Sequence, residues 1–402
     1  MMNQELTTPD LIQPPPFADS QVFLGNQRAM AIFFWHKDVM TQLELFHFCQ
    51  IQTQPDLDQF WLMHELRRFV RSPEIAVIEG NQIEEEYRHR NIQLCCMLDP
   101  AYPIQLKNYK VYPPILAVQG KIELLQAPQV AMVGSRILHE FSETLANIIA
   151  DHLMLRGFVI TSGGALGIDA LSHRQAMARH AQTIVVTGTG PDECYPRKNK
   201  DIFKYAAQNG AIVSQYPINT PAKKLNFPSR NAIIAGLSVA TVIIQCREKS
   251  GALYTANFSN QLKRPVFVAA MPGFDPSTDG GLNLVKSGKA LLLSHKSDLD
   301  ILGTGTDHLN TTQFQRTLEF GQKPDYGTFF QTNDMISDNM IQLTQLQSAI
   351  LTVLKAHPTT RELLRQKLAD HPMISEFDEQ ILELELMDCI ETCRGQYEIK
   401  PS

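Results

Sequence analysis

Six short apolar runs between residues 130 and 269 have the length and composition of buried β-strands, and stretches with helical periodicity separate them. Strands that alternate with helices in this way predict an α/β fold, in which helices cover both faces of a parallel sheet. Ligands of such sheets bind outside the carboxyl ends of the strands. The predicted strands are Val130–Val133, Phe158–Thr161, Thr183–Thr187, Ala211–Ser214, Ala240–Gln245 and Val266–Ala269, and the predicted helices are Phe141–Arg156, Ala170–Arg179, Asn199–Gln208, Asn231–Leu237 and Thr255–Leu262.

The pattern changes on both sides of this region. Residues 27–71 carry apolar clusters with few helix breakers, which predicts helices, and residues 303–340 have the composition of a linker. The last sixty residues predict three helices, over Gln342–Ala356, after Thr359 or Thr360, and from Ser375, followed by a hairpin over Ile390–Tyr397. Three helices and a hairpin indicate a winged-helix domain. We therefore expect an N-terminal helical domain (1–91), a central domain (92–302), a linker (303–340) and a winged-helix domain (341–402).

Composition narrows the class of protein. The chain has 402 residues, of which 44% are hydrophobic, and no apolar run approaches the ~20 residues that a membrane span needs. The first twenty residues show no basic start or apolar core of a signal peptide. The seven cysteines include no CxxC pair and fit neither a disulfide framework nor a zinc site. We expect a cytoplasmic protein that has no membrane partner and binds no metal.

Charge is distributed unevenly along the chain. Residues 1–100 hold 7 basic and 14 acidic side chains, residues 101–302 hold 21 and 13, and residues 303–402 hold 8 and 15. The net charges are therefore −7, +8 and −7, which sum to the −6 of the whole chain. A basic middle between acidic flanks favours an anionic partner for the central domain, although solvated surface charge would give the same arithmetic.

Glycine-rich turns follow the first three predicted strands. Glycine lets backbone N–H groups approach an anion closely, and the helix that follows each turn adds partial positive charge. Three such turns at one sheet edge predict a phosphate-binding edge. The turns are Gly134-Ser135-Arg136, Ser162-Gly163-Gly164 and Gly188-Thr189-Gly190.

Two common phosphate ligands do not fit these turns. A dinucleotide site needs G-x-G-x-x-G after the first strand and an acidic residue after the second, and the chain has neither. An ATP-binding P-loop needs two glycines before Lys-Ser or Lys-Thr, whereas Asn283 and Ala290 occupy two of the required positions. We expect no nucleotide cofactor.

A basic and aromatic segment follows the fourth predicted strand. Residues 217–231 hold three positive charges and no acidic residue. Cations that meet phosphates, interleaved with a ring on which a base can stack, are typical of a platform for single-stranded nucleic acid. The alternative is that the ring fills the core and the lysines are merely solvated. The candidate residues are Lys223, Lys224, Phe227, Arg230 and Asn231.

Catalytic patterns are weaker. Asp169 and His173 are one helical turn apart and would need Ser162 as a nucleophile, but no G-x-S-x-G motif surrounds that serine. Related hydrolases of phosphoribosyl compounds place a glutamate one turn after a glycine loop. After Ser250-Gly251 those positions hold Thr255 to Phe258, which leaves only Glu248, upstream, as a base. A nucleotide or ribosyl hydrolase therefore remains the alternative function.

The order of these motifs resembles one family, the DNA-processing protein A (DprA/Smf) family. The shared motifs are Tyr102-Pro103, Val133 to Arg136, Ser162 to Ala165 with Gly167 to Asp169 and His173, Gly188 to Gly190 with Tyr195-Pro196, Phe227 to Asn231, Ser250-Gly251 with Thr255-Ala256, and Pro272-Gly273. The resemblance implies an extended Rossmann-like, doubly wound sheet, and a sterile-alpha-motif-like N-terminal domain. It also implies a non-enzymatic homodimer that binds single-stranded DNA and helps to load the RecA recombinase in natural transformation.

Roles for individual residues follow from the resemblance. Arg136, Lys224, Phe227, Arg230 and Asn231 would contact DNA, with backbone donors from Ser162 to Gly164. Asp169 and His173, together with Ser250 and Thr255, would support the pocket. The chain departs from the family at Ala232, where a further arginine is usual. The third helix predicted near the C-terminus carries six acidic residues between 375 and 388 and no basic one, so we expect that domain to avoid DNA.

Overall fold

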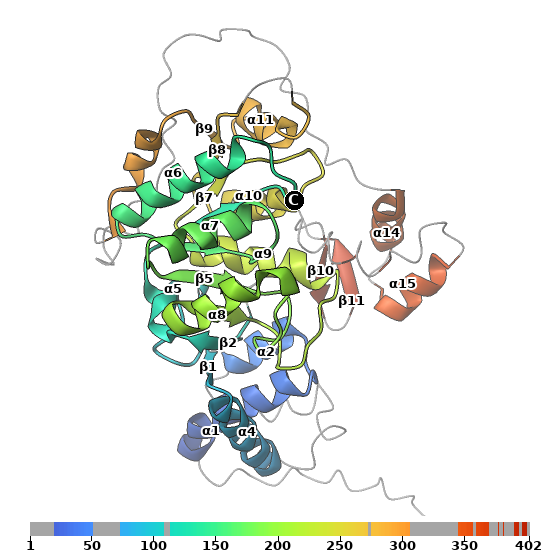
Figure 1. Cartoon of the computed structure of the whole chain (residues 1–402). Helices are drawn as coiled ribbons and strands as arrows, with labels where there is room; N and C mark the ends of the chain where they lie inside the picture. Colours follow the sequence, from blue (N-terminus) through green and yellow to red (C-terminus); the bar gives the residue numbers. More distant parts are fainter. Residues whose placement is uncertain are drawn as a thin grey trace, which may run out of the picture. The chain divides into compact units, whose positions relative to one another are not determined.

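The computed structural model describes residues 20–50, 73–107, 113–271, 275–305, 345–356, 359–369, 377, 381, 390–393 and 396–399 (Figure 1). The chain divides into two compact units, residues 1–323 and residues 324–402. Among the helices that the structure describes, none is long and apolar enough to cross a membrane.

A nine-stranded sheet forms the centre of the first unit. Its strand order is β1-β2-β6-β5-β4-β3-β7-β8-β9. The strands from β6 to β9 in this order run parallel, and β1 and β2 add an antiparallel pair at one edge. The bounds are β1 Ile92–Cys96, β2 Ile115–Gly120, β3 Gln129–Val133, β4 Val159–Ser162, β5 Thr183–Val186, β6 Ala211–Ser214, β7 Ala240–Ile243, β8 Val266–Ala269 and β9 Leu291–Leu293.

The strand order is that of a doubly wound sheet, as predicted. The series of parallel strands starts at β3, moves outward through β4 and β5 to β6, and then returns to place β7 on the other side of β3. The order of connection therefore reverses between β3 and β7. At such a reversal the loops of neighbouring strands part to opposite faces, which leaves room for a ligand at the carboxyl ends. The sequence missed β1, β2 and β9.

Helices cover both faces of the parallel strands (Figure 1). The helices that connect β3 to β6 pack beside one another, and α9 packs against α10 after the reversal. Apolar side chains from α6, the central strands and the segment after β9 form one large core, in which Val130, Ile149 and Leu299 are buried. The bounds are α6 Ser142–Leu155, α7 Ile168–Ala178, α8 Lys200–Asn209, α9 Asn226–Leu237, α10 Ala252–Gln261 and α11 Asp279–Lys286, with the short α5 at Ile104–Lys107.

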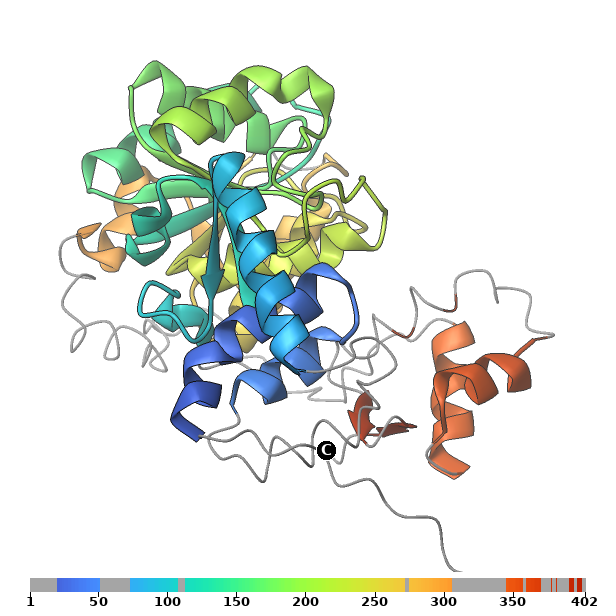
Figure 2. The same cartoon turned by 90° about the horizontal axis from the view of Figure 1, so that it is seen from below.

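The N-terminal helices share a core with the antiparallel edge of the sheet. Helices α1 (Ser20–His36), α2 (Gln42–Cys49) and α4 (Pro73–His89) gather beside β1 and β2 (Figure 2). Buried residues of α1 and α4 form a single cluster with residues of β1 and β2. Arg28 of α1 adds ion pairs of 2.6 Å to Glu84 and 2.7 Å to Asp99. The boundary predicted at residue 91 therefore does not separate two cores.

The second unit contains two of the helices and the hairpin that the sequence predicts. Helices α14 (Gln345–Ala356) and α15 (Arg361–Lys367) are present, and β10 (Ile390–Cys393) pairs with β11 (Gln396–Ile399) as a hairpin. Thr360 caps α15, since its side chain accepts a hydrogen bond from the N–H of Leu363. Apart from the buried Phe377 and Ile381, the predicted third helix lies outside the described residues, and so do its six acidic side chains.

Candidate nucleic-acid interface

The predicted glycine turns lie at the carboxyl ends of neighbouring strands. The first follows β3, the second follows β4 and the third follows β5, and these strands are adjacent in the sheet. Helix α9 reaches the same edge, because the amide of Asn226 donates a hydrogen bond of 2.9 Å to the carbonyl of Gly188 in the third turn. The sequence-predicted segments therefore meet at one edge.

Hydrogen bonds join the first turn to the segment after β7 and to the start of α7. The N–H of Ser135 donates to the carbonyl of Gln245 beyond β7 at 2.8 Å, and the N–H of Ile168 donates to the carbonyl of Ser135 at 3.1 Å. A Cβ atom at Gly134 would lie 2.6 Å from a side-chain carbon of Ile168, so only glycine fits there. Arg136 follows on the surface with its side chain exposed.

The second turn already holds a carboxylate. Asp169, at the start of α7, accepts hydrogen bonds from the N–H groups of Gly163 at 3.1 Å and Ala165 at 3.4 Å. Burial raises the pKa of Asp169, while the positive charge of Arg230 and these N–H groups act in the opposite direction. The prediction that these amides receive a phosphate is therefore wrong for Gly163, because the chain supplies the anion itself. The N–H of Ser135 is likewise used within the chain.

The basic and aromatic segment begins a helix. Phe227 and Arg230 lie three residues apart near the start of α9, with Lys223 and Lys224 just before it. The ring of Phe227 is half-buried and packs over Gly188, where a Cβ atom would be 3.0 Å from the ring. The ring of Tyr195 lies 5.6 Å from that of Phe227, centroid to centroid. Two aromatic rings therefore stand side by side at the exit of β5.

Arg230 does not occupy the surface position that the sequence predicts. Its side chain is only 4% exposed, and its Nη1 donates to the carbonyls of Gly163 and of Val186 at the end of β5. The guanidinium carbon lies 5.5 Å from the centre of the Phe227 ring. Burial lowers the pKa of Arg230 to about 10, and the nearby Asp169 opposes this shift. Arg230 thus joins β4, β5 and α9 and holds Phe227 in place, which corrects its predicted role as a phosphate contact.

Other cations of the edge are exposed. Arg136, Lys223 and Lys224 all present their side chains to solvent. Asn231, also predicted to touch DNA, is half-buried and donates to the carbonyl of Gly251 at 3.1 Å, so it connects α9 to the start of α10. Further exposed cations follow Tyr195 and β7, namely Arg197, Lys198, Lys200, Arg247 and Lys249.

The candidate catalytic residues do not form a relay. The buried Ser162 donates to the carbonyl of Met132 at 2.6 Å. His173 lies between α7 and the sheet with its Nδ1 2.8 Å from the hydroxyl of Thr183, the first residue of β5. Burial lowers the pKa of His173 to about 3, and the charges of Arg230 and Arg174 add to this shift. Neither side chain is exposed at the carboxyl edge of the sheet.

The residues after β7 also have structural contacts. Ser250 Oγ accepts a hydrogen bond of 3.3 Å from the N–H of Ala252 at the start of α10. Thr255 is buried in the same helix, with 1% of its surface exposed. The exposed Glu248, the remaining candidate base, accepts a bond of 3.0 Å from the amide of Asn283.

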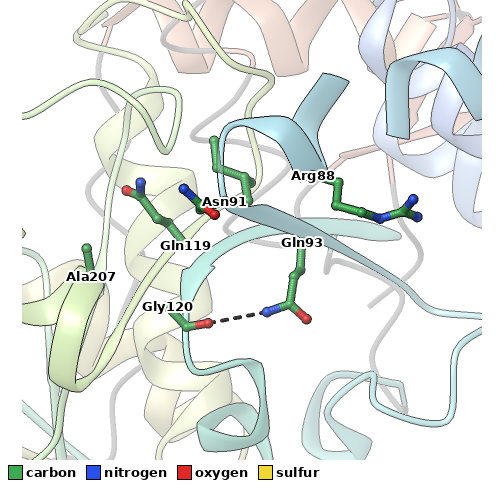
Figure 3. Close-up of a pocket in the computed structure, with 7 residues that line it drawn as sticks. Arg88, Asn91, Gln93, Gln119, Gly120 and Ala207 are labelled. Carbon is green, nitrogen blue, oxygen red and sulfur yellow. Dashed lines mark hydrogen bonds between the residues drawn. The ribbon is translucent and has the colours of Figure 1, made fainter. Parts of the chain in front are cut away.

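A pocket elsewhere lies at the opposite edge of the sheet. It has a volume of about 500 Å³ and lies between the end of α4, strands β1 and β2, and α8 (Figure 3). Gln93 and Gly120 line it and are joined by a hydrogen bond of 3.3 Å. Gly120 pairs with Ala211, the first residue of β6, so this pocket faces the amino ends of the parallel strands. It is separate from the glycine turns.

The fold and the site define a class of protein. It is an extended Rossmann-type α/β protein in which exposed cations and a pair of aromatic rings lie beside the glycine turns, at the carboxyl edge of the sheet. Residues 93–302, just over half of the chain, match the family described as DNA recombination-mediator protein A. The chain belongs to this family.

Individual relatives agree with that assignment. Protein Smf of Synechocystis is 37% identical over 226 residues, which cover 55% of this chain and 57% of that protein. Protein Smf of Escherichia coli is 31% identical over 292 residues, which cover 71% of this chain and 76% of that protein. The X-ray structure of DNA processing protein A from Streptococcus pneumoniae superposes with a TM-score of 0.51 at 24% identity, over 71% of this chain and 97% of that one, which supports the shared fold.

Sequence reasoning missed two features of the edge. The first is that Tyr195 pairs with Phe227, although the two are 32 positions apart. The second is that Asp169 fills the second turn. A signal for the latter was present, since an acidic residue in the first turn of a helix is placed to accept N–H groups of that helix and of the loop before it.

Proposed function

We propose that the chain binds single-stranded DNA along the carboxyl edge of its sheet, without cleaving it. The observation that carries the proposal is the arrangement of Phe227 and Tyr195 among exposed cations. Arg136 and Lys224 approach from different turns, so a polynucleotide could meet both while a base stacks on the aromatic pair. Base stacking tolerates every sequence, because every base has a flat face.

The geometry supports contacts through side chains rather than through the amides of the turns. Asp169 uses two N–H groups of the second turn, and Gln245 uses one of the first. Phosphates would therefore meet flexible guanidinium and ammonium groups on the surface. Such contacts suit a long, variable polymer better than a small ligand of fixed shape, which normally needs an enclosing pocket.

The finer parts of the proposal follow from the family. We infer that the protein protects single-stranded DNA and hands it to a RecA-type recombinase in natural transformation, and that it acts as a homodimer in the cytoplasm. The alternative, hydrolysis of a nucleotide or ribosyl compound, would need an activated base. Glu248 is exposed but accepts a hydrogen bond from the amide of Asn283. Asp169 is buried and accepts hydrogen bonds from two backbone N–H groups. Neither carboxylate is therefore placed as an activated base at the carboxyl edge of the sheet.

A titration at several salt concentrations tests the proposal. Labelled poly-dT and a duplex of equal length are compared, and the single strand should bind more tightly. Contacts from Arg136, Lys223 and Lys224 alone predict a log–log salt slope of about −2, since each phosphate on a single strand contributes ~0.7. A salt-independent affinity, or equal affinity for the duplex, would contradict the proposal. Release of base or phosphate from a nucleotide, abolished by Glu248→Gln, would favour the hydrolase.

A further inference from the structure

An exposed apolar segment lies directly after Arg136. Ile137 is 74% exposed, Leu138 is 42% exposed and Phe141 is 46% exposed. Three large apolar side chains exposed within five positions form a contiguous patch, and patches of this kind are typical of binding surfaces. This segment leads from the first glycine turn to the start of α6, so it continues the edge described above.

The segment is held rigidly. The ring of Phe141 stacks on that of His139, with centroids 5.3 Å apart and an angle of 28° between the planes. The N–H of His139 and the hydroxyl of Ser142 both donate to Oε1 of the buried Gln245, at 3.0 and 2.7 Å. Gln245, just after β7, therefore fixes the residues on both sides of Phe141, and the His139 ring fixes the Phe141 ring. A ring that is already fixed lowers the entropy cost of stacking a ligand on it.

A cation lies beside this ring pair. Nε2 of His139 lies 3.6 Å from a carboxylate oxygen of Asp275. Hydrogen bonds from Ser277 lower the pKa of Asp275, and the charges of His139 and Arg247 act in the same direction. Arg247 follows Gln245, which accepts the hydrogen bond from the N–H of His139, by two positions. Arg247 is exposed just after β7.

The acidic neighbours decide which part of a nucleotide can face Phe141. Glu140 and Glu143 are both exposed next to it, and a carboxylate oxygen of Asp275 lies 3.6 Å from His139 Nε2; these three carboxylates would repel a phosphate. A phosphate is instead favoured at Arg136, and at Arg247, whose positive charge opposes that of Asp275. An uncharged base, in contrast, can stack on the Phe141 ring without penalty.

We propose, building on the function proposed above, that the Phe141–His139 ring pair is a second base-stacking platform for the same single strand, with Arg247 contacting a phosphate beside it. The first platform, Phe227 with Tyr195, lies at the exit of β5, and the second follows β3. Strand β4 separates these two strands, so the exits are roughly 10 Å apart at the usual ~4.8 Å spacing. Arg136 belongs to the first glycine turn, between the end of β3 and Phe141 along the chain.

The length of the DNA separates this inference from the proposed function. Labelled oligonucleotides from dT2 to dT20 are titrated against the wild type and Phe141→Ala. A dinucleotide is too short to reach both platforms, so we expect Phe141→Ala to bind dT2 as the wild type does, and to lose roughly five- to 150-fold in affinity for dT20, the range known for one stacked base. Arg247→Ala should reduce the salt slope by about 0.7 for dT20 and leave it unchanged for dT2.

Matched variants control for folding and for surface hydrophobicity. Phe141→Tyr keeps a flat ring and should restore dT20 binding. Leu155→Ala removes an apolar side chain that is 87% exposed at the far end of α6, and it should have no effect at any length. Photo-crosslinking with 5-iododeoxyuridine in dT20 should mark the peptide that contains His139 and Phe141.

The outcomes are distinct. If Phe141→Ala binds every length as the wild type does, or crosslinks appear only at Tyr195 and Phe227, the second platform is wrong and the proposed function stands. An equal loss at dT2 and dT20 would also overturn it, because Phe141 would then not extend the path. If the wild type binds no oligonucleotide at all, the proposed function itself fails.

Discussion

Asp169 and Arg230 are connected through one residue, Gly163, whose N–H donates to Asp169 and whose carbonyl accepts from Arg230. Both side chains are buried, at 7% and 4% exposure. A buried pair of opposite charges is costly to separate, because each charge loses its compensation in a medium that solvates it poorly. The edge of the sheet is therefore organised around this internal pair, and the exposed cations are arranged outside it.

Removal of one member of this pair should destabilise the first unit. We expect Arg230→Met to lower the free energy of unfolding by about 3–5 kcal/mol, because Asp169 would keep a buried charge without its partner. Adding Asp169→Asn should recover part of that loss, with a coupling of about 0.5–3 kcal/mol. Urea unfolding followed by tryptophan fluorescence measures this, since Trp35 is buried in a core of the first unit. Strict additivity of the two substitutions would contradict the coupling.

Surface cations and the aromatic platform should affect DNA binding in different ways. Arg136→Ala and Lys224→Ala should each make the salt slope shallower by about 0.7, because each loses one phosphate contact. Phe227→Ala should cost ~1–3 kcal/mol of binding free energy and leave the slope nearly unchanged, since stacking releases no counterions. Fluorescence anisotropy with labelled dT20 at four salt concentrations measures both quantities. Identical behaviour of the three variants would indicate general unfolding instead.

Gly163 should be intolerant of even one methyl group. A Cβ atom there would meet Nη1 of Arg230 and lie 2.7 Å from the Asp169 carboxylate. We expect Gly163→Ala to destabilise the first unit by about 1–3 kcal/mol through overpacking. Gly251→Ala is the matched control, because a Cβ atom at Gly251 meets nothing within 4 Å and the backbone there is helical. The melting temperatures of the two variants should therefore differ, and equal values would contradict the crowding at Gly163.

His173 should make the first unit sensitive to acid. Its pKa is lowered to about 3 in the folded protein, from the ordinary value of 6.5, chiefly because the ring is buried. Between these pH values the unfolded chain binds a proton that the folded chain does not, so stability falls as pH falls from 6.5 toward 3. The contribution is about 1.4 kcal/mol per pH unit.

Asparagine offers a test of that pH dependence. The hydroxyl of Thr183 donates to the carbonyl of Ile160 at 2.8 Å, so it accepts the proton of His173 Nδ1. The side-chain amide introduced by His173→Asn could replace that donor without gaining a charge in acid. Unfolding free energies of the wild type and the variant are compared at pH 8, where both are uncharged at this site, and at pH 5. The variant should lose ~2 kcal/mol less between the two pH values. Parallel pH profiles would show that His173 is not the source.

The sequence predicts the parallel sheet better than its edges. The six predicted strands are present because each is a buried apolar run. In contrast, β2 directly follows Pro113 and Pro114, and such a pair of prolines predicts a turn rather than a strand. Helix α9 begins at Asn226 rather than at Asn231, since Pro228 falls in the first turn, where a missing N–H costs nothing.

The sequence predicts which segments meet at the candidate interface, but not which of their side chains are exposed to bind DNA and which are buried. Glycine turns and basic residues are visible in the sequence, and they do meet at one edge. Burial is not visible in this way, because Arg230 and Lys224 are both cations of the same segment and only the packing of α9 on β5 decides that one is buried. The carboxylate that fills the second turn is different, because an acidic residue in the first turn of α7 is visible in the sequence and only its burial is a tertiary feature.

The C-terminal residues should contribute little to DNA affinity. Residues 341–402 hold six basic and ten acidic side chains, so their net charge of −4 would repel a polyanion. Deletion of these residues should leave dT20 affinity unchanged or raise it, with the larger gain at low salt, where repulsion is screened least. Anisotropy titrations of the full chain and the deletion measure this, and the fluorescence of the buried Trp35 checks that the first unit remains folded. A large loss of affinity would instead show that the hairpin or the helices of the second unit hold DNA directly.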